Sequence, residues 1–336
     1  MKATVEMVDK SVSSSGLRDR LRSSVRNFAL LAVLIVLVIL FSLSSPFFFT
    51  IENISNLLLA VSVIGTMAAV STLVIVGRGI DLSLGSICAL AGMATAILVE
   101  VYHWPWFAGV IGGLSVGGLC GAVNGAVIAG IGINPIITTI GTLSIFRGVA
   151  YVLRDGQPVL IENDALLRLG AGHFLHLPLS VWVLAVVFAV TNFVAYYTRV
   201  GRSIYAAGAS PRAALVAGLD VVGIRFWLSV GSGVSAALAG ILLIGQAGSA
   251  SPSSASGYEL WVITAVLLGG TSLSGGEGSV MKTALGVLII GVVNNGMVLL
   301  SVPAFYQIIA NGALLVSAVI IDKLQKGTGS LFADES

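Results

Sequence analysis

Charged side chains are scarce in this sequence of 336 residues. Asp, Glu, Lys and Arg make up 10% of it, against about 25% in a soluble globular protein, while hydrophobic residues make up 57%. The formal net charge is only +2, so the chain lacks the strong positive field that attracts nucleic acid. This composition excludes a soluble enzyme, a disordered chain and a nucleic-acid-binding protein, and it places most of the chain in lipid.

Residues for covalent, metal or nucleotide chemistry are also few. The two cysteines, Cys88 and Cys120, both lie in apolar segments, which argues against a disulfide framework. The three histidines are too scattered along the chain for a metal cluster. No lysine follows a glycine, so the Walker loop that binds ATP is absent, and no His-Glu-x-x-His motif occurs. We therefore expect no catalytic, cofactor-binding or metal-binding residues.

Apolar runs recur along the chain at lengths near the roughly 20 residues that a transmembrane helix needs. We predict an all-α polytopic membrane protein with about ten transmembrane helices, organised as a tail at 1–27, a membrane domain at 28–322 and a second tail at 323–336. One short run predicts a helix that begins in the preceding Ser/Gly stretch or is broken. The runs fall near 28–43, 55–76, 82–99, 105–131, 136–152, 179–197, 225–245, 258–270 (the short one), 281–300 and 305–321.

The distribution of Lys and Arg predicts the orientation, because cytoplasmic loops carry an excess of both. With the N-terminus inside, fourteen of the seventeen lie on the cytoplasmic side and only Arg154 and Arg168 lie outside. Arg147 falls within a span, where we expect it to reach outward. Both termini and residues 198–223 are therefore predicted to be cytoplasmic, and residues 153–178 are predicted to lie outside.

The cytoplasmic segment 198–223 has the pattern of a short helical hairpin. Ser210 is a good N-cap, Pro211 suits the first helical position, and Gly218 is a good helix stop. Several apolar residues follow the cap, which is unusual for a free loop, and a partner surface would explain them: Ala213, Ala214, Leu215 and Val216. We predict that this hairpin docks on another subunit.

The stretch Val76-Gly-Arg-Gly-Ile-Asp-Leu-Ser-Leu-Gly-Ser86 interrupts two apolar runs and places Arg78 and Asp81 beside the membrane. One interpretation is a tight turn, in which Asp81 or Ser83 caps the next helix and the glycines supply positive φ. Another is a broken helix at Gly79 whose polar backbone lines a translocation path. A proton-relay carboxylate is the third.

Short echoes favour an internal duplication, which is common in transporters. Residues 76–86 resemble 268–279, which contain Ser274, and Gly121-Ala-Val-Asn-Gly resembles Gly291-Val-Val-Asn-Asn. Glycine-rich sequences match one another easily, so the duplication stays open. The echoes also contain polar residues within spans, which either line a hydrophilic path or bridge helices: Asn124, Asn294 and Asn295.

Glycines recur at every fourth position in the run at 105–131. This spacing places them in one ridge along a single helix, where a neighbouring helix approaches closely. We predict a packing surface formed by Gly109, Gly113, Gly117, Gly121 and Gly125.

Three motifs, in order, resemble the permease subunits of bacterial ABC sugar importers, and most of all their ribose-type branch. They are Gly79-Ile-Asp-Leu-Ser-Leu-Gly-Ser, the hairpin from Gly201 to Ala214, and Gly269-Gly-Thr-Ser-Leu-Ser-Gly-Gly-Glu-Gly-Ser. The chain departs from the family at Arg78, where a glycine is usual. By this resemblance the hairpin is the segment that couples to the ATPase, with candidate residues Gly201, Arg202, Tyr205, Gly208, Pro211, Ala213, Ala214 and Gly218.

The resemblance implies a bacterial inner-membrane protein with several partners. These are a cytoplasmic ABC ATPase that holds ATP and Mg²⁺, a second permease copy or paralogue, and a periplasmic sugar-binding protein. Two alternatives stay open: a proton-coupled sugar transporter, which the scarcity of intramembrane carboxylates disfavours, and an ABC permease for a nucleoside or a branched-chain amino acid. The candidate path residues are Gly79, Asp81, Ser83, Asn124, Ser274, Asn294 and Asn295.

Overall fold

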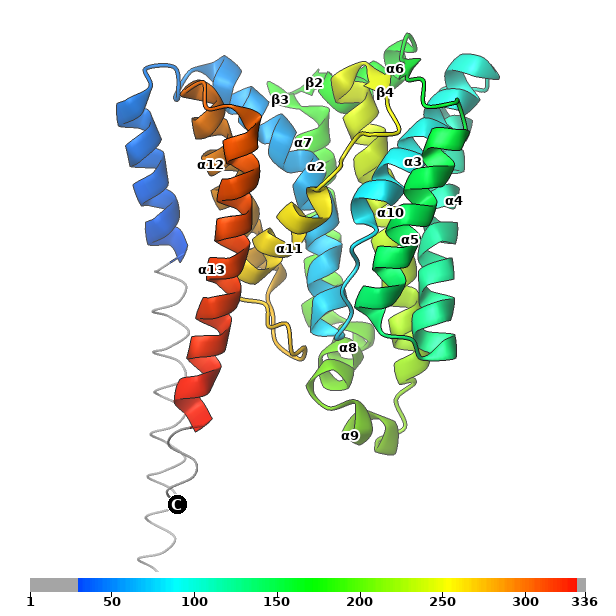
Figure 1. The fold of residues 1–336 in the computed structure, drawn as a ribbon, viewed down its shortest axis with the longest axis vertical. Coiled ribbons are helices and arrows are strands. Elements are labelled where there is room, and N and C mark those ends of the chain that lie inside the picture. Colours follow the sequence, from blue (N-terminus) through cyan, green and yellow to red (C-terminus); the bar gives the residue numbers. More distant parts are fainter. Residues whose placement is uncertain (1–29, 331–336) are drawn as a thin grey trace, which may run out of the picture.

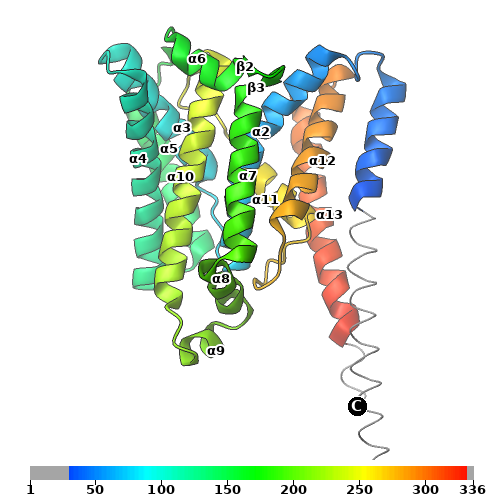
Figure 2. The same cartoon turned by 180° about the vertical axis from the view of Figure 1, so that it is seen from behind.

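The computed structural model describes residues 30–330, which are almost entirely helical (Figures 1 and 2). Helices α3 and α4 each continue into a π-helical turn, η1 and η2. The helices are Leu30–Ser44, α2 (Ile51–Val76), α3 (Leu84–Ala96), η1 (Ile97–Val101), α4 (Trp106–Gly125), η2 (Ala126–Ile131), α5 (Pro135–Val152), α6 (Asp164–Ala171), α7 (Leu179–Tyr197), α8 (Arg199–Ala209), α9 (Pro211–Val216), α10 (Val221–Ala247), α11 (Tyr258–Leu268), α12 (Val280–Leu299) and α13 (Ala304–Ser330).

The all-α polytopic fold predicted from the apolar runs is confirmed, and each run lies within a few residues of a helix. Seven of the described helices are long and apolar enough to cross a membrane. Three apolar helices are shorter, Leu30–Ser44, Tyr258–Leu268 and Ala304–Ile320. The predicted tail at 1–27 lies outside the described residues, as does the part of the second predicted tail (323–336) that follows residue 330. Helix α13 continues through the first part of that second tail.

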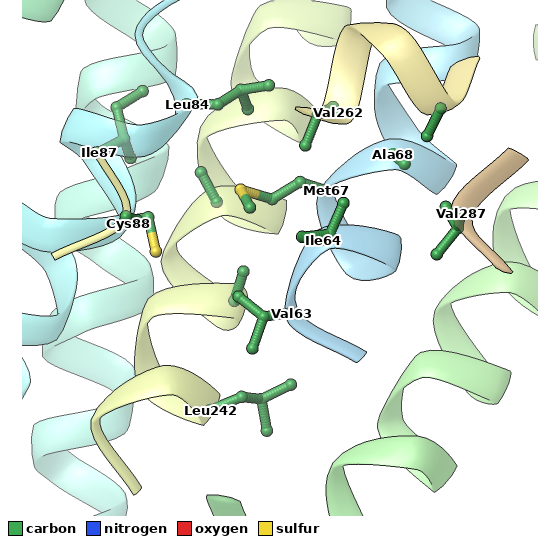
Figure 3. Close-up of a cluster of buried hydrophobic side chains, with 14 of the residues drawn as sticks. Val63, Ile64, Met67, Ala68, Leu84, Ile87, Cys88, Leu242, Val262 and Val287 are labelled. Atoms are coloured by element: carbon green, nitrogen blue, oxygen red, sulfur yellow. The ribbon is translucent and has the colours of Figure 1, made fainter. Parts of the chain in front are cut away.

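Helix α2 is the centre of the bundle. Its lower two-thirds are buried among α7, α10, α11 and α12. Figure 3 shows the apolar cluster around it, where Val63 and Met67 of α2 meet Leu242 of α10 and Val262 of α11. Four short strands tie the loops together at one end of the bundle: β1 (Val159–Leu160) pairs with β4 (Ser249–Ala250), and β2 (His173–Phe174) pairs with β3 (Leu177–Pro178).

Two helices begin inside the bundle rather than at its surface. The chain leaves α2 at one end and returns through residues 77–83 to start α3 partway up (Figure 1). Helix α10 runs opposite to α2, and the chain then returns through residues 248–257 to start α11. At 11 residues, α11 is only about 16 Å long and cannot span a bilayer alone. The run at 258–270 is therefore a broken helix.

This arrangement agrees with an inverted internal repeat, in which corresponding segments run in opposite directions. The echo between residues 121–125 and 291–295 falls on α4 and α12, the helices that follow the two interior starts. The predicted correspondence between residues 76–86 and 268–279 is wrong, because residues 76–86 join α2 to α3 whereas residues 268–279 join α11 to α12. The structural counterpart of residues 77–83 is 248–257.

The glycine ridge of α4 is a packing surface, as predicted. All five glycines are buried. A Cβ on Gly113 would collide with Thr95 of α3, and one on Gly121 would collide with Ser229 of α10. Because the ridge has no side chains, α4 packs closely against both α3 and α10, and this holds the walls of the site described below.

Candidate functional site

The segment 77–83 turns sharply at the end of α2. The amides of Gly77, Arg78 and Gly79 donate to carbonyls of the last turn of α2, at 2.9, 2.9 and 2.8 Å. The prediction that glycines supply the positive φ here is wrong. Gly77 has φ −75°, Gly79 is not left-handed, and Arg78 has φ +65°, a conformation that side chains larger than glycine rarely adopt.

Asp81 lies inside the bundle rather than beside the membrane, with 8% of its surface exposed. Its Oδ1 accepts hydrogen bonds from the Ser83 amide at 2.9 Å and the Ser83 hydroxyl at 2.6 Å. Its Oδ2 accepts from the Ser232 hydroxyl of α10 at 2.6 Å. Asn124 of α4 donates from Nδ2 to the Ser83 hydroxyl at 2.9 Å. These contacts join the break to two neighbouring helices.

The structure thus brings together Asp81, Ser83 and Asn124, which the sequence singled out separately. Ser83 occupies the N-cap position of α3, but its side chain makes no capping bond and turns to Asp81 instead. Sequence reasoning missed Ser232. The only signal was a serine at every third position of α10, from Ser229 to Ser235, which places hydroxyls on one helix face.

A narrow pocket with room for about one water molecule opens beside this network. The Oδ1 atom of Asn124 is buried and has no hydrogen-bond partner among residues 30–330. An unpaired buried oxygen of this kind is costly unless a water or a solute hydroxyl reaches it. The lining of the pocket includes Gly77, Arg78, Gly79, Ile80, Asp81, Asn124, Thr139, Arg225 and Ser229. It thus combines two arginine side chains with polar groups that accept hydrogen bonds.

Asp81→Ala is expected to lower the free energy of unfolding by about 3 kcal/mol, because two buried serine hydroxyls and one buried amide lose their acceptor. Asp81→Asn keeps one acceptor and the shape, so it is expected to cost less than half as much. Thermal unfolding of the detergent-purified variants measures both. Equal stability of Asp81→Ala and the wild type would show that the network does not hold the break.

The remaining candidate path residues lie away from Asp81. Asn295 of α12 and Asn53 of α2 exchange two amide hydrogen bonds, of 3.0 and 2.7 Å, so Asn295 bridges helices. Its neighbour Asn294 is half-buried in α12. Ser274 lies in the loop between α11 and α12, where its amide donates to the Ser272 hydroxyl. Gly79 is the exception, because it lines the same pocket as Asp81.

Two charged residues within the bundle make contacts that the sequence did not predict. Arg147 of α5 does not reach outward, because its Nη1 donates to the carbonyls of Pro252 and Ser254 at 2.6 and 2.7 Å. It therefore fastens the return segment 248–257 to α5. Glu259, in the first turn of α11, lies against Gly85 of α3, and its Oε2 is buried without a hydrogen-bond partner in the described chain. The two interior helix starts meet at this carboxylate.

The hairpin at 198–223 folds as its capping residues predict. Thr198 caps α8, and the Ser210 hydroxyl accepts from the Ala213 amide at 3.3 Å to cap α9, with Pro211 at its first position. Gly218 has φ +80° and ends α9. Its amide donates to Leu215, and the Leu219 amide donates to Ala214, which is the paired bonding of a Schellman motif.

The small residues of the hairpin serve contacts within this chain. Ala214 is 4% exposed and packs with Ala207 and Val221, so it does not face outward as the docking prediction assumed. Gly208 lies against Val76 and Gly276, and no Cβ fits there. The large apolar residues exposed at the tip are Leu215 and Val216, which are 56% and 91% exposed.

Tyr205 fastens α8 to the loop after α11, because its hydroxyl donates to the Gly278 carbonyl at 2.9 Å. Burial raises the pKa of this phenol, so the hydroxyl keeps its proton. Other hairpin candidates divide by exposure: Gly201 is buried against the end of α7, while Arg202 and Ala213 are exposed. In Figure 2 the hairpin hangs below α7 and α10 as the part that projects furthest from the bundle among the labelled helices.

Comparison with known proteins gives one family and several relatives. Residues 53–319 match the profile of a family described as branched-chain amino acid transport system / permease component. The ribose import permease protein RbsC of Escherichia coli K12 is 40% identical over 296 residues, covering 87% of this chain and 92% of that protein. The L-arabinose ABC transporter permease protein AraH of Azospirillum brasilense is 35% identical over 318 residues, covering 95% and 94%. No solved structure matches the chain significantly.

Proposed function

The chain belongs to this family of transport-system permease components, and we propose that it is the permease subunit of an ABC importer for a monosaccharide. The observation that carries the proposal is its similarity, over most of both chains, to permeases named for ribose, L-arabinose and D-allose. The permease itself would hold no nucleotide. ATP and Mg²⁺ would bind to a partner ATPase, and a periplasmic binding protein would deliver the sugar to a pair of permeases in the inner membrane.

The arrangement of the hairpin suits a part in coupling. An importer of this kind needs a rigid docking element and a path that alternates between two states. The tip of α9 offers apolar side chains outside the membrane, and α8 contacts both the end of α2 and the loop after α11. Movement of the hairpin would therefore shift the edges of the break at 77–83, where Gly79, Asp81 and Asn124 would line the path.

The orientation of the bundle follows from the same proposal. The described end of α13 and the hairpin lie at one end, and α6 with the short strands lies at the other (Figure 1). Helix Leu30–Ser44 runs toward the end that carries α6. We infer that the hairpin end is cytoplasmic, because it carries most of the Lys and Arg. Both termini would then be cytoplasmic and residues 153–178 periplasmic.

A labelling experiment tests this orientation. In a variant that lacks Cys88 and Cys120, a cysteine at Phe174 is expected to react with an impermeant maleimide added to spheroplasts, because this residue is 57% exposed in the outer segment. A cysteine at Arg212, in α9, is expected to react only after the membrane is opened. Labelling of position 212 from outside without labelling of 174 would reverse the proposed topology.

Reconstitution tests the function. Proteoliposomes that contain the permease, its ATPase and the binding protein are expected to take up monosaccharide only when ATP is present on the side of the membrane that carries the ATPase. A protonophore is expected to have no effect while ATP is maintained. Uptake that needs a proton gradient and no ATPase would favour the symporter. Because the family profile is described for branched-chain amino acids, leucine is the matched competitor. Uptake of leucine in place of sugar would replace the substrate and keep the mechanism.

A further inference from the structure

We propose that Arg78 is a positioning residue that links the coupling hairpin to the break beside Asp81, so that movement of α8 is passed to the path. The inference rests on the proposed function, and it concerns a charged residue inside the break itself. Arg78 is the second residue of the segment 77–83 and lies three residues before Asp81.

The side chain of Arg78 grips the end of α8. Its Nε donates to the Gly208 carbonyl at 2.6 Å, and its Nη2 donates to the Ala209 carbonyl at 2.9 Å. The last carbonyls of a helix lack partners within the helix and carry its partial negative charge. A guanidinium satisfies two of them at once, and its planar fork fixes their direction in a way that a single ammonium does not.

The backbone of Arg78 has an unfavourable conformation, and the contact with α8 offsets its free-energy cost. At φ +65° the residue is in the left-handed region, where glycine is far easier to accommodate. A glycine would satisfy the turn without strain, but it would leave the two carbonyls of α8 without their donors. The side chain therefore supplies two hydrogen bonds to the end of α8 that the turn itself does not need.

A third segment meets the same point. The Gly276 amide donates to the Val76 carbonyl at 2.8 Å, and Gly275 packs against the aliphatic part of Arg78. Gly208 has no room for a Cβ because Val76 and Gly276 lie against it. The ends of α2 and α8 and the loop after α11 therefore form one junction, within which the Arg78 side chain joins the end of α2 to the end of α8.

Arg78→Gly tests the link, because it removes the side chain and suits the backbone. In the reconstituted transporter we expect the number of sugars imported per ATP hydrolysed to fall about fivefold or more, the scale of a typical coupling between two sites. Arg78→Lys keeps the charge but lacks the planar fork of the guanidinium. Its number of sugars imported per ATP is expected to lie between those of the wild type and Arg78→Gly. Asp155→Gly is the matched control, since Asp155 also has φ above zero, at +50°, and lies at the opposite end.

Hydrogen exchange of the purified permease gives a second readout that needs no transport. Amides of residues 206–210 and 212 are expected to exchange several-fold faster in Arg78→Gly and to be unchanged in Asp155→Gly. Unchanged exchange and an unchanged sugar-to-ATP ratio in Arg78→Gly would overturn the proposal. If the wild type itself shows no ATP-driven uptake, the proposed function fails, and the exchange of these amides still decides whether Arg78 fixes the end of α8.

Discussion

Val216→Asp is expected to abolish most ATP-driven uptake while leaving the permease folded and inserted. Val216 is the last residue of α9 and is 91% exposed, so the substitution disturbs no packing within the chain. In the docked complex an aspartate at this point would be buried without a partner. Loss of a central apolar contact in an interface typically costs about 2 kcal/mol or more, or about 30-fold in affinity. Uptake, ATPase stimulation and co-purification with the ATPase measure the effect together.

The controls separate docking from folding. Val216→Leu keeps an apolar tip and is expected to retain uptake and co-purification. Ala214→Glu is a poor test of docking, because Ala214 packs inside the hairpin and a carboxylate there would disrupt α9 itself. If Val216→Asp binds its ATPase and transports like the wild type, the tip of α9 is not the docking surface.

Gly117→Ala is expected to lower the free energy of unfolding of the permease by about 1–3 kcal/mol, the usual cost of an overpacked contact. The added Cβ would lie 2.5 Å from the Gly233 carbonyl oxygen and would collide with Ala237. Both neighbours belong to α10, so α4 and α10 would have to separate. Gly117→Leu adds three further carbons and is expected to prevent accumulation of folded protein. Thermal or denaturant unfolding in detergent measures the first variant, and membrane yield measures the second.

Gly130→Ala is the matched control for this prediction. It lies in the continuation of the same helix, and a Cβ there would meet no atom within 4 Å. We expect its stability to remain within about 0.5 kcal/mol of the wild type, as for an exposed substitution. If both alanine variants are equally stable, the glycine ridge tolerates a methyl group and does not fix the spacing of α4 and α10.

Local features of the chain were predictable from the sequence. The helices could be predicted because a segment that crosses a bilayer must be long and apolar and must satisfy its backbone hydrogen bonds within itself. The caps at Ser210 and Gly218 depend on residues only a few positions away, so their signals are complete within the hairpin. The glycine ridge follows from helical spacing alone. Membership in a permease family was visible in three short motifs, and the family comparison confirms it.

Contacts between distant residues were decided by the tertiary structure. Asp81 meets Ser232, which is 151 positions away, so its depth and its partner could not be read from the turn around it. Arg147 turned inward to carbonyls 105 and 107 positions away rather than outward to water. Ala214 faced its own chain because α9 folds back on Ala207 and Val221. Hydropathy reflects whether a segment lies in lipid or in water, and capping depends on residues a few positions away. The partner of a buried polar or small side chain depends instead on which helices pack together.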